Sequence, residues 1–132
     1  HSLNVLYAVQ QARCHDADLA AAALLHDVGK LASDEAGVRI GLWLRGPLVL
    51  LEAWTPCTLR YLAQDDKRSG IRYAVYVHME HPQIGAAWAA ESGWRSLTCW
   101  LIRHHQDEIA EVPGSEEWLS LLAVLQMADS QK

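Results

Sequence analysis

A histidine and an aspartate stand side by side where an apolar run of the sequence ends. The run, from Asp18 to Leu25, is rich in alanine and leucine, and this pattern predicts a helix that is buried on most sides. His26 and Asp27 follow it directly. Because an ionised carboxylate in apolar surroundings must be paired or bound to a metal, the pair predicts a nearby cation.

The residues after this pair suggest an anion as well as a metal. Neighbouring side chains on a helix point about 100° apart, so His26 and Asp27 could both reach an ion that lies between them. Lys30 comes four residues after His26 and can lie on the same side. Gly29 allows a backbone or a ligand to approach closely.

Further polar side chains fall on apolar helical stripes toward the end of the chain. His81 and Pro82 are predicted to open a helix that Gly93 ends, because proline suits the first turn of a helix and glycine its end. The next helix is predicted from about Arg95 to His105. Its inward stripe consists of Leu97, Trp100, Leu101 and His104. This stripe places His104 inward, with His105 about 100° away.

The last predicted helix carries a carboxylate on its apolar side. Ser115 is a candidate N-cap, and Glu116 and Glu117 suit the first turn. One stripe of this helix contains Trp118, Leu122, Leu125 and Asp129. A lone carboxylate is unfavourable on such a face, so something must compensate Asp129.

Together with the histidine at the start of the sequence, these residues form one set of candidate ligands, the constellation: His1, His26, Asp27, His81, His104, His105 and Asp129. A helical bundle assembles an interior metal site from one ligand group per helix. Nitrogen and carboxylate ligands without thiolate suit Fe, Mn, Zn, Ni or Co. His15 and Asp16 also form a histidine–aspartate pair, but we interpret theirs as a solvated turn. His78 is a competitor of His81 that we rate as incidental.

This ordered set resembles the HD-domain superfamily of metal-dependent phosphohydrolases. The resemblance runs through the constellation, the Gly29-Lys30 pair, the segment after His81 and Ala128. It implies an all-α, single-domain helical bundle over residues 1–132, with an apolar helical insert at about 39–63. It also implies that one metal ion binds His1, His26, Asp27 and Asp129. A second ion would share Asp27 and add His81 and His104, with His105 as a further candidate.

The resemblance implies a hydrolytic enzyme that uses one or two divalent ions. Its H-D-x-G-K pattern and paired histidines look closer to the bimetal branch, which includes cyclic-dinucleotide phosphodiesterases. Gln106-Asp107-Glu108 follows the paired histidines in place of a Gly-Tyr-Pro signature, so hydrolysis of cyclic di-GMP is not carried over. The implied substrate is a phosphomonoester or phosphodiester, with a nucleotide or cyclic nucleotide favoured. Metal-activated hydroxide would attack it, with Asp27 and Lys30 as catalytic residues.

Two other classes of function stay open. Some HD proteins resemble this pattern but are di-iron oxygenases that cleave C–H or C–P bonds. A metal-containing module that senses a ligand without turnover is the other alternative.

The remaining segments are predicted from their composition and from the residues that interrupt helices. Residues 2–14 have a helical stripe, and residues 31–38 form a polar loop. Residues 39–63, broken by two prolines, predict one or two short helices that cover the core; a lid or oligomer contact with Arg39 and Arg45 near a substrate is the alternative. Residues 64–70 read as a charged turn, and 71–77 as irregular or helical.

Composition limits the partners. The apolar fraction of 51% is typical of a globular protein, and the net charge of −5 argues against a nucleic acid polymer or an anionic membrane surface as partner. Cys14, Cys57 and Cys99 show no metal-binding spacing and are expected to be reduced, buried thiols of a cytoplasmic protein. No membrane span or signal peptide is apparent. The oligomeric state stays open.

Overall fold

The computed structural model describes residues 1–12, 15–37 and 42–131, without the side chains of 42–46 and 49. Within these ranges the regular structure is helical and no strand occurs, which confirms the predicted all-α class. The chain divides into two compact units, the first formed by residues 1–29 and 82–132 and the second by residues 30–81. Each unit is described by itself.

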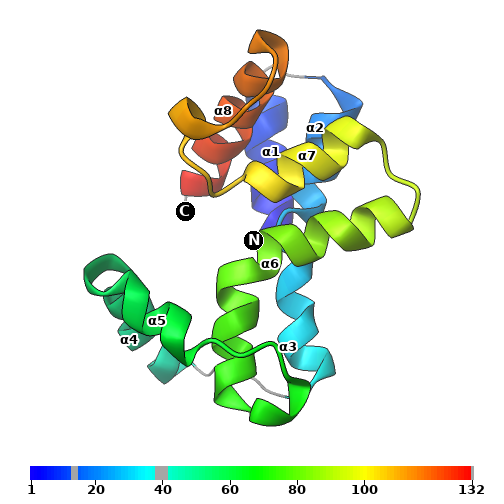
Figure 1. The fold of residues 1–132 in the computed structure, drawn as a ribbon. Helices are drawn as coiled ribbons and strands as arrows, with labels where there is room; N and C mark the ends of the chain where they lie inside the picture. Colours follow the sequence, from blue (N-terminus) through cyan, green and yellow to red (C-terminus); the bar gives the residue numbers. More distant parts are fainter. Residues whose placement is uncertain (13–14, 38–41, 132) are drawn as a thin grey trace. The chain divides into compact units, whose positions relative to one another are not determined.

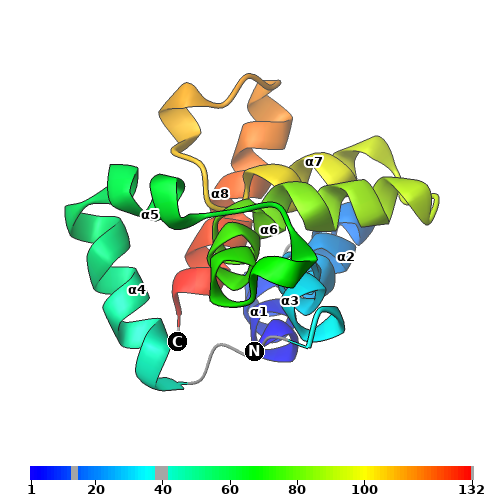
Figure 2. The ribbon, with the colours of Figure 1, turned by 60° about the horizontal axis from the view of Figure 1, so that its bottom comes forward.

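The first unit is a bundle of helices. Its elements are α1 (Ser2–Gln11), α2 (Ala17–Leu25), α7 (Ser96–His104), the short helix η3 (Ile109–Glu111), α8 (Glu116–Ser130) and the C-terminal half of α6 (Ile71–Glu91). Helix α2 packs against α1, α7 and α8, and these helices lie together in both views (Figures 1 and 2). Val9, Leu19, Leu101, Leu122 and Leu125 are fully buried in its core. Apolar stripes therefore meet in one interior, as their spacing predicts.

Polar caps set where two of these helices begin. The Asp16 carboxylate accepts a hydrogen bond from the backbone N–H of Leu19 at 2.9 Å. The Ser115 hydroxyl accepts one from the N–H of Trp118 at 3.2 Å. The Ser115 cap was predicted from the sequence and is confirmed. Each of the two caps satisfies a backbone donor that the first turn leaves open.

Asp18, in the first turn of α2, is a buried carboxylate. The side chain lies inside the first unit and accepts a hydrogen bond from the Thr98 hydroxyl at 2.7 Å. Arg95 approaches its other oxygen at 3.1 Å. These contacts join α2 to α7 and thereby fix the rotation of α7, because both Thr98 and Asp18 are buried.

The second unit begins at Lys30, the last residue of the short helix η1 (Val28–Lys30). It contains α3 (Leu31–Glu35), α4 (Leu42–Trp54), α5 (Pro56–Leu62), η2 (Lys67–Ser69) and the first half of α6. Leu48, Leu59 and Val75 form its core, and α4 packs on α5. Of the segment 39–63, for which one or two short helices were predicted, the described residues form two helices, α4 and α5. The prediction of a polar loop at 31–38 is wrong for Leu31–Glu35, which form about one and a half turns of helix. Arg39 and the Arg45 side chain lie outside the described residues.

Helix α6 differs from the prediction at its start and agrees at its end. It begins at Ile71, so residues 71–77 are helical and Pro82 lies in the helix interior, not at its first turn. At its C-terminus Gly93 adopts φ +83°, and the N–H groups of Gly93 and Trp94 donate to the carbonyls of Ala90 and Ala89. This pairing is the Schellman motif, which a glycine in the left-handed region permits.

Two further expectations concern the cysteines and the membrane. Cys57 is exposed and Cys99 is half-buried, so the expectation of buried thiols is wrong for Cys57. Cys14 lies outside the described residues. Among the helices of the described ranges, none combines the length and the apolar character needed to cross a bilayer.

Candidate metal centre

Three elements of the first unit bring four predicted ligands together. His1 immediately precedes α1, His26 and Asp27 follow α2, and Asp129 lies in the last turn of α8. One ligand atom each of His1, His26 and Asp27 falls within a group whose atoms all lie within 4.8 Å of one another. The bundle therefore brings these four residues, which come from three distant parts of the sequence, close to one another.

The spacing of the ligand atoms suits a single ion. The Nε2 atom of His1 lies 2.7 Å from Asp129 Oδ1 and 4.0 Å from Asp27 Oδ2. The Nε2 atom of His26 lies 3.4 Å from Asp129 Oδ1 and 3.7 Å from Asp27 Oδ2. Two ligand atoms that each sit about 2.1 Å from one ion lie roughly 3–4 Å apart, so an ion fits with small adjustments.

His26 supplies the strongest evidence that these residues fit a metal ion. Its side chain is fully buried, and Nε2 has no hydrogen-bond partner among the described residues. Its Nδ1 lies 2.9 Å from the carbonyl oxygen of Ala23, and a carbonyl can only accept, so Nδ1 carries the proton. In the neutral ring the lone pair of Nε2 is then directed at the two carboxylates, an arrangement that is repulsive without a cation between them.

Asp27 faces a third histidine with its other oxygen. Its Oδ1 lies 3.9 Å from Nε2 of His105, while its Oδ2 faces His1 and His26. The rings of His26 and His105 pack edge to face with centroids 5.2 Å apart. A carboxylate with ligands on both sides can bridge two ions, which supports the bridging role that the resemblance implies.

His104 and His105 are buried in the reverse of the expected order. His105 is 3% exposed, whereas His104 is half-buried, and its Nδ1 lies 2.6 Å from Asp107 Oδ2. The ring of His104 packs on Trp100, and the Gln126 amide donates to the backbone carbonyls of His104 and Asp107. The expectation that His104 points inward is therefore wrong, and its role as a ligand stays a prediction that these contacts do not support.

The stripe of α7 that is buried in the structure is as regular in the sequence as the stripe that was predicted to be buried. Its buried members are Thr98, Leu101, Ile102 and His105, which repeat the i, i+3, i+4, i+7 pattern. Thr98 decides between the two stripes, because its hydroxyl donates to the buried Asp18. The sequence did contain a signal for this choice. Asp18 lies one turn before Ala22 on the α2 stripe that ends at His26, and a carboxylate on that buried stripe needs a polar partner such as Thr98.

Gly85 on α6 allows the backbone after Asp27 to lie close. A Cβ placed on Gly85 would lie 3.2 Å from the backbone nitrogen of Gly29, 3.2 Å from Val28 Cγ1 and 3.3 Å from Ile102 Cγ2. These distances are tighter than most real Cβ contacts. A glycine at this position therefore lets α6 support the turn that carries Asp27.

His81, His78 and Lys30 belong to the second unit. His81 is buried, and its Nδ1 donates to the carbonyl oxygen of His78 at 2.7 Å. The His78 ring lies 3.2 Å from Glu52, so His78 is engaged elsewhere. Lys30 ends η1 with an exposed side chain. The roles of His81 as a ligand and of Lys30 as a phosphate-binding group stay predictions.

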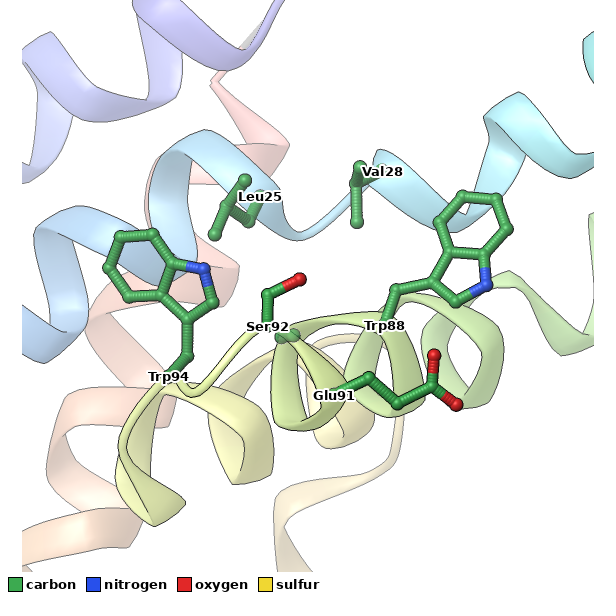
Figure 3. A pocket seen from close by; sticks show the side chains of 7 residues that line it. Leu25, Val28, Trp88, Glu91, Ser92 and Trp94 are labelled. Carbon is green, nitrogen blue, oxygen red and sulfur yellow. The ribbon is translucent and has the colours of Figure 1, made fainter.

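A separate pocket of about 310 Å³ lies between α2 and the end of α6. Figure 3 shows Trp94 and Trp88 at its opposite ends, Ser92 between them, and Leu25 and Val28 across from α6. The described candidate ligands do not line it. Because neighbouring side chains diverge on a helix, Leu25 can line this pocket while His26 faces the carboxylates.

A comparison with protein families decides the classification. The model of the HD domain matches residues 1–130, which is nearly the whole chain. The chain belongs to the HD domain family. Most members of this superfamily are metal-dependent hydrolases, and the His/Asp cluster of this HD domain fits a divalent ion. Neither the search of curated proteins nor that of solved structures found a match.

Proposed function

We propose that this HD domain is a metal-dependent phosphohydrolase that acts on a phosphomonoester or phosphodiester, with a nucleotide or cyclic nucleotide as the favoured substrate. One observation carries the proposal: the buried Nε2 atom of His26 faces the carboxylates of Asp27 and Asp129, and it has no hydrogen-bond partner among the described residues. Hydrolysis by a metal ion needs such a site, formed by nitrogen and carboxylate ligands.

Each residue of the centre has a separate task in this proposal. His1, His26, Asp27 and Asp129 would hold one ion, and the Ala23 carbonyl keeps the His26 ring in the required tautomer. A bound divalent ion would lower the pKa of its water toward about 7 and so supply hydroxide at neutral pH. Asp27, with both oxygens facing histidines, would orient that nucleophile and bridge to a second ion.

Lys30 would bind the substrate. It follows Asp27 by three residues, and its ammonium group touches no metal in this proposal. A compact cation pairs with a non-bridging phosphoryl oxygen, and the attraction grows as negative charge develops there in the transition state. His81 and His105 would complete the ligands of a second ion.

A phosphate-release screen tests the proposal. The untagged protein is freed of metal, reloaded separately with Fe, Mn, Zn, Ni or Co, and assayed on p-nitrophenyl phosphate, bis(p-nitrophenyl) phosphate, nucleotides and cyclic nucleotides. We expect turnover with at least one metal and one ester, and none with Asp27→Ala. Oxygen consumption by the iron-loaded protein without phosphate release would instead indicate an oxygenase. Absence of turnover in every combination would favour a sensing module.

A further inference from the structure

Three buried histidines make the same hydrogen bond. In each, Nδ1 donates to the backbone carbonyl three residues earlier; the pairs are His26 with Ala23 at 2.9 Å, His81 with His78 at 2.7 Å and His105 with Ile102 at 2.7 Å. A carbonyl only accepts, so each Nδ1 carries a proton, and in the neutral ring the lone pair is then on Nε2. The bond to the backbone thus selects the tautomer that a metal ligand needs.

Two of the three carbonyls are available because a helix ends there. Helix α2 ends at Leu25 and α7 ends at His104, so Ala23 and Ile102 both lie in a last turn. The last four carbonyls of a helix have no backbone donor within the helix. A histidine at the C-cap, as His26 and His105 both are, can reach such a carbonyl with Nδ1.

The third carbonyl, that of His78, lies in the interior of α6, where a backbone N–H four residues later would normally occupy it. That residue is Pro82, which has no N–H. The carbonyl is therefore left for His81, whose ring binds it at 2.7 Å. Removing one donor within a helix has the same local effect as ending the helix.

We propose that Pro82 is a positioning residue for His81: by leaving the His78 carbonyl without its helical donor, it holds the His81 ring in the tautomer that carries its proton on Nδ1. This inference rests on the proposed metal centre for its purpose, but the tautomer itself is a property of the metal-free chain. A proline in a helix interior is unfavourable, so a compensating role accounts for its place.

The tautomer is measured directly by ¹⁵N NMR of the histidine rings in the metal-free protein. We expect the Nδ1–H form for His26, His81 and His105 in the unmodified chain. In Pro82→Ala, whose restored N–H competes for the His78 carbonyl, only His81 should shift toward the Nε2–H form. Finding His81 as Nε2–H in the unmodified chain, or unchanged in Pro82→Ala, would overturn the proposal. If the chain binds no metal, the proposed function fails, yet this measurement still decides the inference.

Metal affinity gives a second, independent result. Loss of a group that orients a metal-binding histidine typically weakens metal binding by about 10–100-fold. The affinity of Pro82→Ala for the second ion should therefore fall by about tenfold, while the melting temperature of this variant stays equal or rises. Pro47→Ala is the matched control, since Pro47 also lies inside a helix, α4. It should leave ion binding unchanged. Equal losses in both variants would show that removing a helical proline, not orienting His81, causes the effect.

Discussion

Lys30 separates substrate binding from metal binding in this account, because it is the one catalytic residue that touches no ion. We expect Lys30→Ala to keep its metal content and to lose turnover by about a hundred- to thousandfold, which corresponds to about 2.7–4 kcal/mol of electrostatic stabilisation. Asp27→Ala should lose activity and most metal together. Rate and metal content are measured on the same preparations.

His15→Ala controls for the choice of histidine–aspartate pair. His15 is exposed, and its neighbour Asp16 caps α2, so the variant should resemble the unmodified protein in rate and in metal content. If Lys30→Ala loses metal as Asp27→Ala does, the phosphate-binding role is wrong. If His15→Ala loses metal, the site belongs to the other pair.

The two adjacent histidines of α7 allow a matched comparison. His105 faces Asp27 at 3.9 Å, whereas His104 is held by Asp107 at 2.6 Å. His105→Gln should therefore lower the number of ions bound per chain, and His104→Gln should not. Elemental analysis after dialysis checks this prediction. The opposite order would mean that metal binding turns His104 away from Asp107.

For single residues, the sequence could predict which side chains need a partner, but it could not predict the direction of every side chain. Asp129 was expected to need a partner, and His1 lies 2.7 Å from it. His104 and His105 both complete regular stripes, so periodicity alone does not choose between them. The choice depends on a long-range bond, from Thr98 to Asp18, that links residues 80 positions apart.

The elements that hold Asp27 leave no room for a side chain at Gly85. Gly85→Ala gains helix propensity of about 1 kcal/mol, but its Cβ would lie 3.2 Å from the backbone nitrogen of Gly29. Since backbone yields less readily than a side chain, we expect a net destabilisation of about 1–3 kcal/mol and weaker ion binding. Denaturant unfolding and metal titration measure the two effects.

Ala87→Gly is the control on the same helix. Ala87 is exposed, so the substitution should cost about 1 kcal/mol of helix stability and leave ion affinity unchanged. Gly85→Ala with unaltered metal affinity would mean that α6 does not support the Asp27 turn.

Helix ends were predictable where local chemistry sets them, as at Asp16, Ser115 and Gly93. The start of α6 was not, because proline at a first turn and proline inside a helix look alike in sequence. Contacts within the second unit, including the packing of the buried Val75 on Leu48 and Leu59, favour the longer helix. Leu31–Glu35 were misread for a related reason: a polar segment of five residues is too short for periodicity to show.

For the whole molecule, metal binding should contribute to stability, since the carboxylates and the buried His26 need a cation between them. A ligand of the native state adds about 2.7 kcal/mol at a hundredfold excess over its dissociation constant. For a chain of 132 residues this corresponds to a melting temperature higher by on the order of 10 °C. Chelation should remove that increment in a calorimetric scan. An unchanged melting temperature after complete removal of metal would mean that the carboxylates are satisfied in another way.

The number of ions bound per chain tests the central claim most directly. Untagged protein, His26→Ala and His15→Ala are loaded with Mn, dialysed against metal-free buffer and analysed for protein and metal together. We predict at least one ion per chain in the unmodified protein and in His15→Ala, and a loss of bound metal in His26→Ala with the helical circular dichroism retained. An unmodified protein without metal, or a folded His26→Ala that keeps the full complement, would contradict the account.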